Sequence, residues 1–257
     1  MRHRRPRRPD GPVWIRTYPL TLERDHVEPP HAHEWDQLTY AASGVLHVET
    51  ADVRWVVPPH RAVWVPAGMT HVERMFGPVS VRTLYLAEGL ATGLPNHCQT
   101  VNVSSLLREL ILHVTRHGAL NRRTPTHARL IGVLLDQLTA VSQVSLQLPL
   151  PRDERALRLA SLLSADPSDT AVFGTLARHA GASRRTLERI FLRETKMTVG
   201  EWRRRMRLLH AVRLLAAGQS VTAVALEAGY SSVSAFVAVF KKTFGTTPGR
   251  YSMTRVT

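Results

Sequence analysis

Two patterns of hydrophobic and polar positions divide this chain. From residue 13 to residue 86, short runs rich in Val, Tyr, Trp and Thr are separated by Gly and Pro, which is typical of β-strands and their turns. From residue 104 onward, apolar residues recur every three or four positions, which is typical of amphipathic helices. The sequence therefore predicts an α+β protein of two domains, with a β-rich N-terminal part and a helical C-terminal part.

The first pattern predicts a sandwich or a barrel, because its strands are short and regularly spaced. The predicted strands are residues 37–40, 45–50, 54–57, 62–66, 71–75 and 79–86, with turns at 43–44, 58–59, 67–68 and 77–78. We assign residues 11–90 to this domain.

Two amphipathic helices are predicted to follow within residues 98–145. One begins after Ser104 with the stripe Leu106, Leu107, Leu110, Ile111 and Val114, and the other covers residues 125–141 with the stripe Leu130, Leu134, Leu135, Leu138 and Val141. Amphipathic helices bury their stripes against something else. These two pack on the strands, on each other, or on a second subunit in a dimer. Residues 146–152 are then the predicted linker.

A short pattern is written twice after this linker, at residues 176–191 and 224–240. Each copy has a short helix, a Gly (Gly181 or Gly229) suited to the turn, a Ser that can cap (Ser183 or Ser231), and a second helix ending in Phe. This is the pattern of a helix-turn-helix.

The spacing of the two copies suits DNA. Between them, residues 199–217 form an uninterrupted helical pattern. Such a helix spans about 28 Å at 1.5 Å per residue, close to the roughly 34 Å between successive major grooves on one face of B-DNA. One polypeptide is therefore able to place two recognition helices in adjacent grooves.

Residues 153–251 resemble the DNA-binding domain of the AraC/XylS family of bacterial transcription regulators. The closing pattern Phe240-x-x-x-Phe244-Gly245-x-x-Pro248-x-x-Tyr251 adds to the repeat in carrying this resemblance. It implies an all-α domain over residues 153–257 with two helix-turn-helix motifs. The implied partners are double-stranded DNA, a small-molecule effector and RNA polymerase, with the protein a homodimer in the cytoplasm at the bacterial nucleoid and not at a membrane.

The two copies differ in the residues they offer to DNA. Arg185 and Arg189 lie one turn apart and are predicted to reach base edges, because bidentate Arg–guanine pairs are the commonest specific contact. Glu188 is predicted to accept from cytosine or to orient an arginine. The second copy has serines and Ala238, so specificity is expected to rest on the first copy. The candidate DNA contacts are Ser183, Arg184, Arg185, Thr186, Glu188, Arg189, Ser231, Ser232, Ser234, Lys241 and Lys242.

Charge supports a polyanionic partner for the C-terminal part. The chain carries 34 Lys and Arg against 20 Asp and Glu, a formal net charge of +14. Residues 152–257 hold 18 of these basic and 8 of these acidic residues, a net charge of +10. A basic excess gathered on the repeat favours nucleic acid over a generally basic surface. Arg203, Arg204, Arg205 and Arg207 on the long helix are either a solvated face or phosphate contacts.

Other composition features exclude some classes of protein. Cys98 is the only cysteine, which excludes an internal disulfide and a thiolate-rich metal site and suits a reducing cytoplasm. The sequence has no apolar run approaching the 18 residues of a membrane helix. Residues 2–8 are basic but lack a following apolar segment, so we interpret them as an arm and not a secretory signal.

The β-rich part contains histidines at a recognisable spacing. His31-x-His33-x-x-x-Gln37 and, later, Pro66-x-Gly68-x-x-His71 resemble the two motifs of the cupin barrels. In that superfamily the matching positions line the barrel mouth and bind a metal, and the resemblance gives His31, His33 and His71 that role. Gln37 stands where the family has a glutamate, and a neutral amide is a weaker ligand.

The chemistry of this site has two readings. Three imidazoles and an amide oxygen suit a divalent metal such as Zn²⁺, Ni²⁺, Fe²⁺ or Mn²⁺, so a metal cofactor is a candidate. Alternatively, the same residues line an effector pocket or hydrogen-bond to one another, and the barrel mouth is the default small-molecule site.

The expected function is therefore that of a sequence-specific, ligand-responsive transcription regulator and not of an enzyme. The runs Val-Pro-Pro and Ala-Val-Trp-Val-Pro-Ala-Gly resemble a cupin-bearing, NimR-like branch of the AraC/XylS family, which suggests efflux or detoxification genes as targets. The alternatives are a metal-dependent cupin enzyme fused to a DNA-binding domain, and a nonspecific architectural DNA binder.

Overall fold

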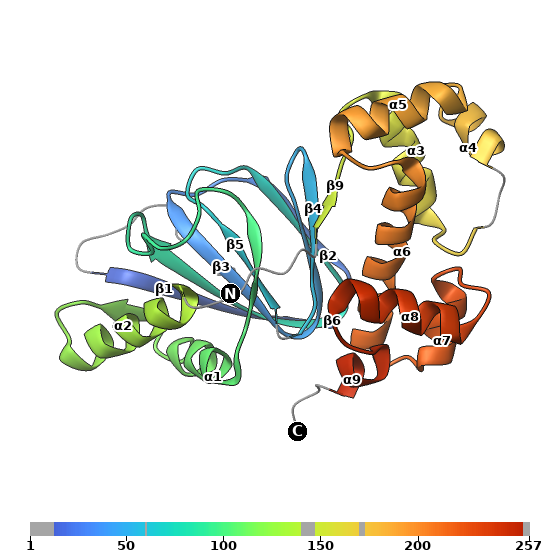
Figure 1. Cartoon of the computed structure of the whole chain (residues 1–257). Coiled ribbons are helices and arrows are strands. Elements are labelled where there is room, and N and C mark those ends of the chain that lie inside the picture. Colours follow the sequence, from blue (N-terminus) through green and yellow to red (C-terminus); the bar gives the residue numbers. More distant parts are fainter. Residues whose placement is uncertain (1–12, 60, 140–146, 170–172, 254–257) are drawn as a thin grey trace. The chain divides into compact units, whose positions relative to one another are not determined.

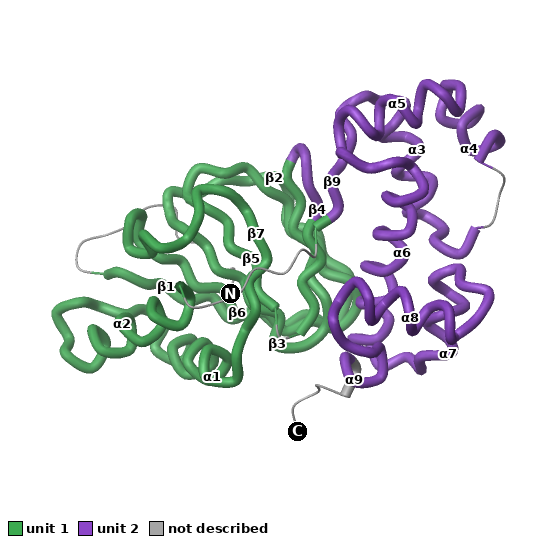
Figure 2. Tube along the Cα trace, in the orientation of Figure 1, with its two compact units in different colours: residues 1–50, 55–147 green, residues 51–54, 148–257 purple. Residues whose placement is uncertain are grey.

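The protein consists of two compact units in the computed structural model, which describes residues 13–59, 61–139, 147–169 and 173–253. Unit 1 comprises residues 1–50 and 55–147, and unit 2 comprises residues 51–54 and 148–257 (Figures 1 and 2). The basic segment 2–8 and Val141, both part of our predictions, lie outside the described residues. Among the described residues, no helix is long and apolar enough to cross a bilayer.

Unit 1 is built on a mainly antiparallel sheet. Its central path runs β7-β5-β3-β6-β1-β8, with β2 paired to β6 and β4 paired to β3. The strands are β1 (Val13–Leu22), β2 (His26–His31), β3 (Trp35–Glu49), β4 (Val53–Val57), β5 (Arg61–Val65), β6 (His71–Ala87), β7 (Gln99–Asn102) and β8 (Ala119–Asn121).

Two long strands replace four of the predicted short ones. β3 and β6 pair from Trp35 opposite Ala87 to Glu49 opposite Val72, with register shifts on either side of Ser43. Gly44 lies at this irregularity with φ +73°, and a Cβ on it would stand 2.4 Å from the Pro78 carbonyl oxygen. The turns predicted at 43–44 and 77–78 are therefore wrong, because both glycine-containing sites are irregularities inside continuous strands.

The helices α1 (Ser105–Val114) and α2 (Pro125–Thr139) pack within unit 1. Their buried residues share one hydrophobic core with strand residues such as Ile15, Leu38 and Leu84; they are Leu107, Ile111, Val114, Ile131, Leu134 and Leu138. The sequence left three packing partners open: the strands, the other helix and a second subunit. Most of each apolar stripe packs against the strands and the other helix. Leu106, predicted to be part of the stripe, is instead 53% exposed.

The described part of unit 2 is helical apart from residues 51–54 and the short strand β9 (Gln147–Pro149) at its N-terminal edge. Its helices are α3 (Glu154–Ala165), α4 (Phe173–His179), α5 (Arg184–Thr195), α6 (Val199–Ala216), α7 (Val221–Glu227), α8 (Val233–Phe244) and α9 (Pro248–Met253). The long α6 contacts α5 near one end and α7 and α9 toward the other (Figure 1). It therefore joins two groups of helices, α3–α5 and α7–α9 (Figure 1).

The ends of the repeated helices are fixed by local hydrogen bonds. The Ser183 hydroxyl caps α5 by accepting from the Thr186 N–H at 3.2 Å, as predicted. In the second copy the cap is Ser232, which accepts from the Ala235 N–H at 3.1 Å. The predicted cap at Ser231 is wrong, because one more residue separates Gly229 from α8 than separates Gly181 from α5.

Two arginines of α6 serve the fold. Arg207 donates to the carbonyl oxygens of Pro167 (2.7 Å), Asp169 (3.0 Å) and Gly229 (3.3 Å). Arg203 also donates to the Asp169 carbonyl. These carbonyls lie in the segment after α3 and in the turn between α7 and α8, so Arg207 ties both to α6. For these two arginines, both predicted roles, a solvated face and phosphate contact, are wrong, because their guanidinium groups hydrogen-bond to backbone carbonyls.

The closing motif forms an aromatic cluster. The Phe240 ring lies 4.6 Å from that of Phe244 and 5.5 Å from that of Tyr251, centroid to centroid. Gly245 ends α8 in the left-handed region, with φ +73°, and Pro248 starts α9 at a position that needs no N–H donor. The cluster packs the last helix on α8.

Gly229 offers a test of this packing. It has φ +73°, and a Cβ would lie 2.7 Å from the Arg207 guanidinium carbon and 3.0 Å from the Pro167 carbonyl oxygen. Gly229→Ala is expected to lower the free energy of unfolding by about 2–3 kcal/mol, since it adds a clash to the cost of a left-handed alanine. Urea unfolding of the full chain, followed by circular dichroism at 222 nm, measures this loss.

Gly181→Ala is the matched control. Gly181 has φ +78°, but the nearest atom to its added Cβ is Arg158 Nη2 at 3.4 Å. In this control the free energy of unfolding should fall by only about 1 kcal/mol, the cost of an alanine in the left-handed conformation. Equal losses in the two variants would contradict the bracing role of Arg207.

Candidate nucleic-acid interface and histidine site

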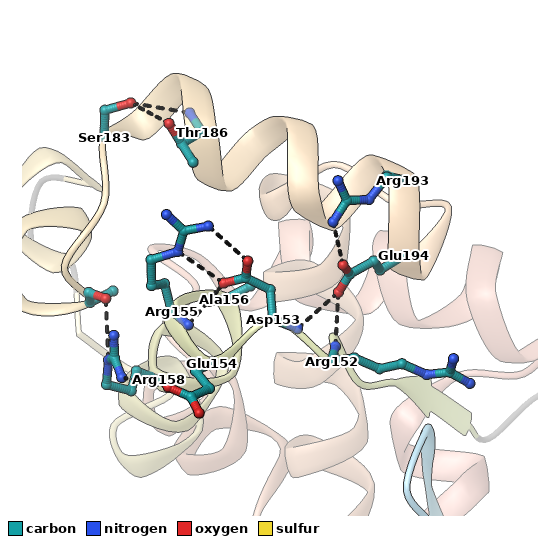
Figure 3. A network of polar contacts seen from close by, with 11 residues as sticks. Arg152, Asp153, Glu154, Arg155, Ala156, Arg158, Ser183, Thr186, Arg193 and Glu194 are labelled. Carbon is teal, nitrogen blue, oxygen red and sulfur yellow. Dashed lines mark hydrogen bonds and ion pairs between the residues drawn. The ribbon is translucent and has the colours of Figure 1, made fainter.

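The helix α5 is held against the rest of unit 2 by its apolar side. Leu187, Ile190 and Phe191 are buried, as the sequence predicted, and the Phe191 ring meets the Trp202 ring of α6 edge-on at 5.6 Å. At the N-terminal end, the hydroxyls of Ser183 and Thr186 lie 2.9 Å apart beside the cap. These two predicted contact residues are thus occupied in starting the helix (Figure 3).

The C-terminal end of α5 is anchored through Glu194. Its Oε2 accepts from the backbone N–H groups of Arg152 (2.8 Å) and Asp153 (3.1 Å), immediately before α3. Its Oε1 accepts from Arg193 at 2.6 Å (Figure 3). The Arg193 bond and these backbone donors hold the pKa of Glu194 below its usual range. Both ends of α5 are therefore fixed, which gives its outer face a defined orientation.

That outer face presents two available guanidinium groups. Arg185 and Arg189 are exposed, and no hydrogen bond or ion pair holds either of them within the described part of the chain. Arg184 is also exposed, but its guanidinium lies over the Phe173 ring of α4 at 5.3 Å. Arg185 and Arg189 follow at i and i+4, so they share one face of the helix.

Glu188 has a structural hydrogen bond. Its Oε2 accepts from the Val199 N–H at 3.1 Å, and Val199 is the first residue of α6. The carboxylate therefore satisfies one of the unpaired N–H groups at the start of that helix. Sequence reasoning missed this partner, because Glu188 and Val199 belong to different helices.

The outer face of α8 has a different composition. Ser231, Ser232, Ser234 and Ala238 are exposed, as are Lys241 and Lys242 in the last turn. Counted from the first residue of each helix, Ser234 takes the place of Arg185 and Ala238 that of Arg189. This face offers hydroxyls and two ammonium groups without arginine.

In unit 1, the structure brings the predicted histidines together. His31, His33 and His71 each offer a nitrogen, and these atoms all lie within 4.8 Å of one another. The ring centroids of His31 and His71 are 4.3 Å apart, and those of His33 and His71 are 5.2 Å apart. His33 and His71 are buried, and His31 is half-buried at the end of β2.

Backbone carbonyls set the tautomers of these rings. The Nδ1 atoms of His31, His33 and His71 lie 2.8, 2.6 and 2.9 Å from the carbonyl oxygens of Pro29, Trp35 and Met69. Because a carbonyl only accepts, each Nδ1 carries the proton in the neutral ring, which leaves the lone pair on Nε2. The His71 Nε2 is buried and has no hydrogen-bond partner in the described part of the protein. Nδ1–H groups bonded to carbonyls are a common second shell of metal-binding histidines.

Gln37 completes the set and leads to a residue that the sequence analysis missed. Its Oε1 lies 2.5 Å from His33 Nε2, and its Nε2 donates to Glu73 Oε1 at 2.7 Å and to Thr39 Oγ1 at 2.7 Å. Glu73, on β6, is only 1% exposed. Its position two residues after His71 was a signal in the sequence, since side chains at this separation share one face of a strand.

Burial favours the neutral form of two of these histidines, His33 and His71. It lowers the pKa of His33, and it lowers the pKa of His71 to about 4. Neutral imidazoles are the form in which histidine binds metals. Three nitrogens and one amide oxygen thus have the donor types of a Zn²⁺-like site, and the residues present fit a divalent metal ion.

The chain is similar to known transcription regulators. Residues 176–254 match a family described as Helix-turn-helix domain. The HTH-type transcriptional regulator NimR of Escherichia coli K12 is 34% identical over 225 residues, which cover 88% of this chain and 82% of NimR. The HTH-type transcriptional activator RhaR of Mannheimia succiniciproducens is 24% identical over 254 residues, 91% of each protein. Because 225 residues exceed either unit, the likeness to NimR includes both.

Several solved structures match over almost the whole chain. ToxT from Vibrio cholerae O395 is 13% identical, with a TM-score of 0.41 over 95% of this chain and 99% of ToxT.

The role of Glu188 can be separated from that of its arginine neighbours. Glu188→Ala removes the acceptor for the Val199 N–H, and the loss of a helix-capping acceptor costs about 1 kcal/mol. Urea unfolding should show this decrease in stability, whereas Glu227→Ala at the exposed end of α7 should change stability by less than about 0.5 kcal/mol. Unchanged stability in Glu188→Ala would show that the carboxylate does not support α6.

Proposed function

The chain belongs to the AraC/XylS family of helix-turn-helix transcription regulators, and we propose that it reads DNA through two such motifs, α4–α5 and α7–α8, under the control of a ligand bound in unit 1. It is a DNA-binding regulator and not an enzyme, as the relatives of both units are regulators. The observation that carries the DNA-reading proposal is the pair of exposed, unengaged arginines on the anchored helix α5.

The two motifs divide the work of binding. Arg185 and Arg189 on α5 read bases, because a guanidinium matches the two acceptors on the major-groove edge of guanine. On α8, Lys241 and Lys242 contact phosphates, and the serines bond to phosphates or bases. Phosphate contacts fix the register of a protein on DNA without reading its sequence. The first motif is thus the reader and the second is the anchor.

Arginine substitutions test the reader. Arg185→Ala and Arg189→Ala should each weaken binding to the operator by about 1–3 kcal/mol and relax the preference at one base position. Fluorescence anisotropy on the operator and on its single-base variants measures both effects. If both variants bound operator and random DNA as the wild type does, α5 would not be the reading helix.

Lys242→Ala tests the anchor. It should weaken binding to operator and random DNA alike and reduce the dependence of log K on log salt by about one unit, since one phosphate contact is lost. Titrations at several salt concentrations provide this slope. A loss confined to one base position would instead make Lys242 a reader.

The ligand site of unit 1 is proposed at His31, His33, Gln37 and His71. The convergent ring nitrogens of the three histidines and the buried His71 Nε2 without a hydrogen-bond partner support a divalent metal ion there. When bound, such an ion supplies a positive charge that takes the lone pairs of these residues. They come from β2, β3, β6 and the segment between β2 and β3, so occupancy would fix those elements relative to one another. A small organic effector binding beside the ion, in a cupin-like barrel, completes this proposal.

Dimerisation is proposed at α1 and α2. The stripes of these helices are mostly covered within unit 1, but Leu106 and Val133 remain 53% and 43% exposed. Exposed large apolar residues on adjacent helices favour a contact with a second copy. The sequence resemblance to the NimR-like branch adds the proposal that the regulated gene serves efflux or detoxification.

One experiment addresses the whole proposal. Genomic fragments selected by the purified protein, with and without added Zn²⁺, are sequenced and aligned. A shared motif whose enrichment changes with the metal is expected. Recovery of fragments without any motif would favour the nonspecific architectural alternative over a sequence-specific regulator.

A further inference from the structure

The contact between His33 and Gln37 is too short for two neutral acceptors. His33 Nδ1 lies 2.6 Å from the Trp35 carbonyl oxygen, so it carries the proton, and His33 Nε2 lies 2.5 Å from Gln37 Oε1. Lone pairs on both atoms repel at this distance. A metal cation bound by both atoms relieves this repulsion with the imidazole left neutral.

Reversing the amide of Gln37 does not solve this problem, because Glu73 is on its other side. The Gln37 Nε2 stands 2.7 Å from Glu73 Oε1. With the amide reversed, its oxygen would face that carboxylate oxygen, and two acceptors would again meet in the interior. Buried acceptors without a donor destabilise the fold, and more so when one of them is charged. Glu73 therefore decides that the amide oxygen points at the histidines.

Thr39 supports the same orientation. Its Oγ1 accepts from Gln37 Nε2 at 2.7 Å and donates to Glu73 Oε1 at 3.3 Å. A hydroxyl has one proton, so it donates to the carboxylate and accepts from the amide, as this arrangement requires. Thr39 and Glu73 are both buried, and β3 and β6, their strands, are paired along much of their length.

We propose that Glu73 is a positioning residue that makes Gln37 an oxygen ligand, so that His31, His33, His71 and Gln37 bind a divalent first-row transition-metal ion. By accepting from the amide N–H, the carboxylate raises the negative charge on the amide oxygen, because hydrogen bonds in a chain polarise one another. It also places one negative charge near a doubly charged ion in a region of low dielectric. This inference rests on the metal site proposed above and extends it to a residue outside the ligand set.

Metal titration of the full chain tests the role of Glu73. Chelator-treated wild type and Glu73→Gln are titrated with Zn²⁺ by calorimetry, and Co²⁺ absorption reports the coordination. The wild type should bind one Zn²⁺ per chain. Glu73→Gln should bind about 10–100-fold more weakly, the usual effect of losing a second-shell partner. Unchanged affinity in Glu73→Gln with a metal-binding wild type would overturn the role of Glu73 alone.

A matched control and a rescue variant accompany this titration. Glu49→Gln makes the same chemical change at the end of β3, where Glu49 is partly exposed and pairs with Arg74, and this variant should bind Zn²⁺ as the wild type does. The double exchange Gln37→Glu with Glu73→Gln keeps one carboxylate and one amide inside and puts the carboxylate in the ligand position, so it should bind Zn²⁺ at least as tightly as the wild type even if Glu73→Gln alone fails to fold. A folded double variant that binds more than tenfold more weakly would overturn the proposal.

A wild type without Zn²⁺ or Co²⁺ binding would remove the metal site itself. The DNA-reading part of the proposed function would be unaffected by that result, because anisotropy measurements on the operator test it separately.

Discussion

The pairing of polar groups inside each unit decides which charged residues remain for binding. An unpaired buried donor or acceptor costs about 1–3 kcal/mol. Backbone carbonyls of loops near a core therefore need hydrogen-bond donors, which side chains of neighbouring helices supply. In unit 2, Arg207 meets this need for the carbonyls of Pro167, Asp169 and Gly229. Net charge alone therefore overstates the surface that DNA meets.

The same constraint separates the arginines of α5 from those of α6. Arg185 and Arg189 lie on the solvent side of a helix whose two ends are already satisfied, by Ser183 at one and Glu194 at the other. Their guanidinium groups are not needed for the fold. A basic sequence thus supplies two kinds of arginine, and only the three-dimensional neighbours distinguish them. The asymmetry of the repeat follows from this, since Ser234 and Ala238 replace the two available arginines on α8.

Structural features that depend on residues close together in the sequence could be predicted from it. The helices of unit 2 were predictable, because periodicity and caps act within a few residues; α6 and the buried face of α3 agree with the pattern. The cap at Ser231 was wrong by one residue, since the two copies were assumed to have equal turns. β1 and β2 were not predicted, because β1 lacks a clean alternation of buried positions and β2 contains Pro29 and Pro30.

Contacts between distant residues were the other limit. Short runs on either side of Gly44 read as two strands, and only the Pro78 carbonyl on the neighbouring strand explains why a glycine stands there. The histidine spacing found His31, His33 and His71, which the structure places together. It could not find the partners of Gln37, because Thr39 and Glu73 converge through the pairing of β3 with β6.

The cupin motif has a glutamate at position 37, where this chain has Gln37. The folded structure changes the expected effect of this difference on metal binding. Read along the sequence, Gln37 removes a negative charge from the ligand set and weakens a metal site. In the folded unit, Glu73 returns a negative charge one hydrogen bond away, and its acceptor fixes the direction of the amide. In the proposed metal site, this arrangement would keep an overall charge suited to a divalent ion while the direct ligands stay neutral. Because neutral ligands hold a cation less tightly than carboxylates do, such a site would suit reversible occupancy, which the proposed response to a ligand requires.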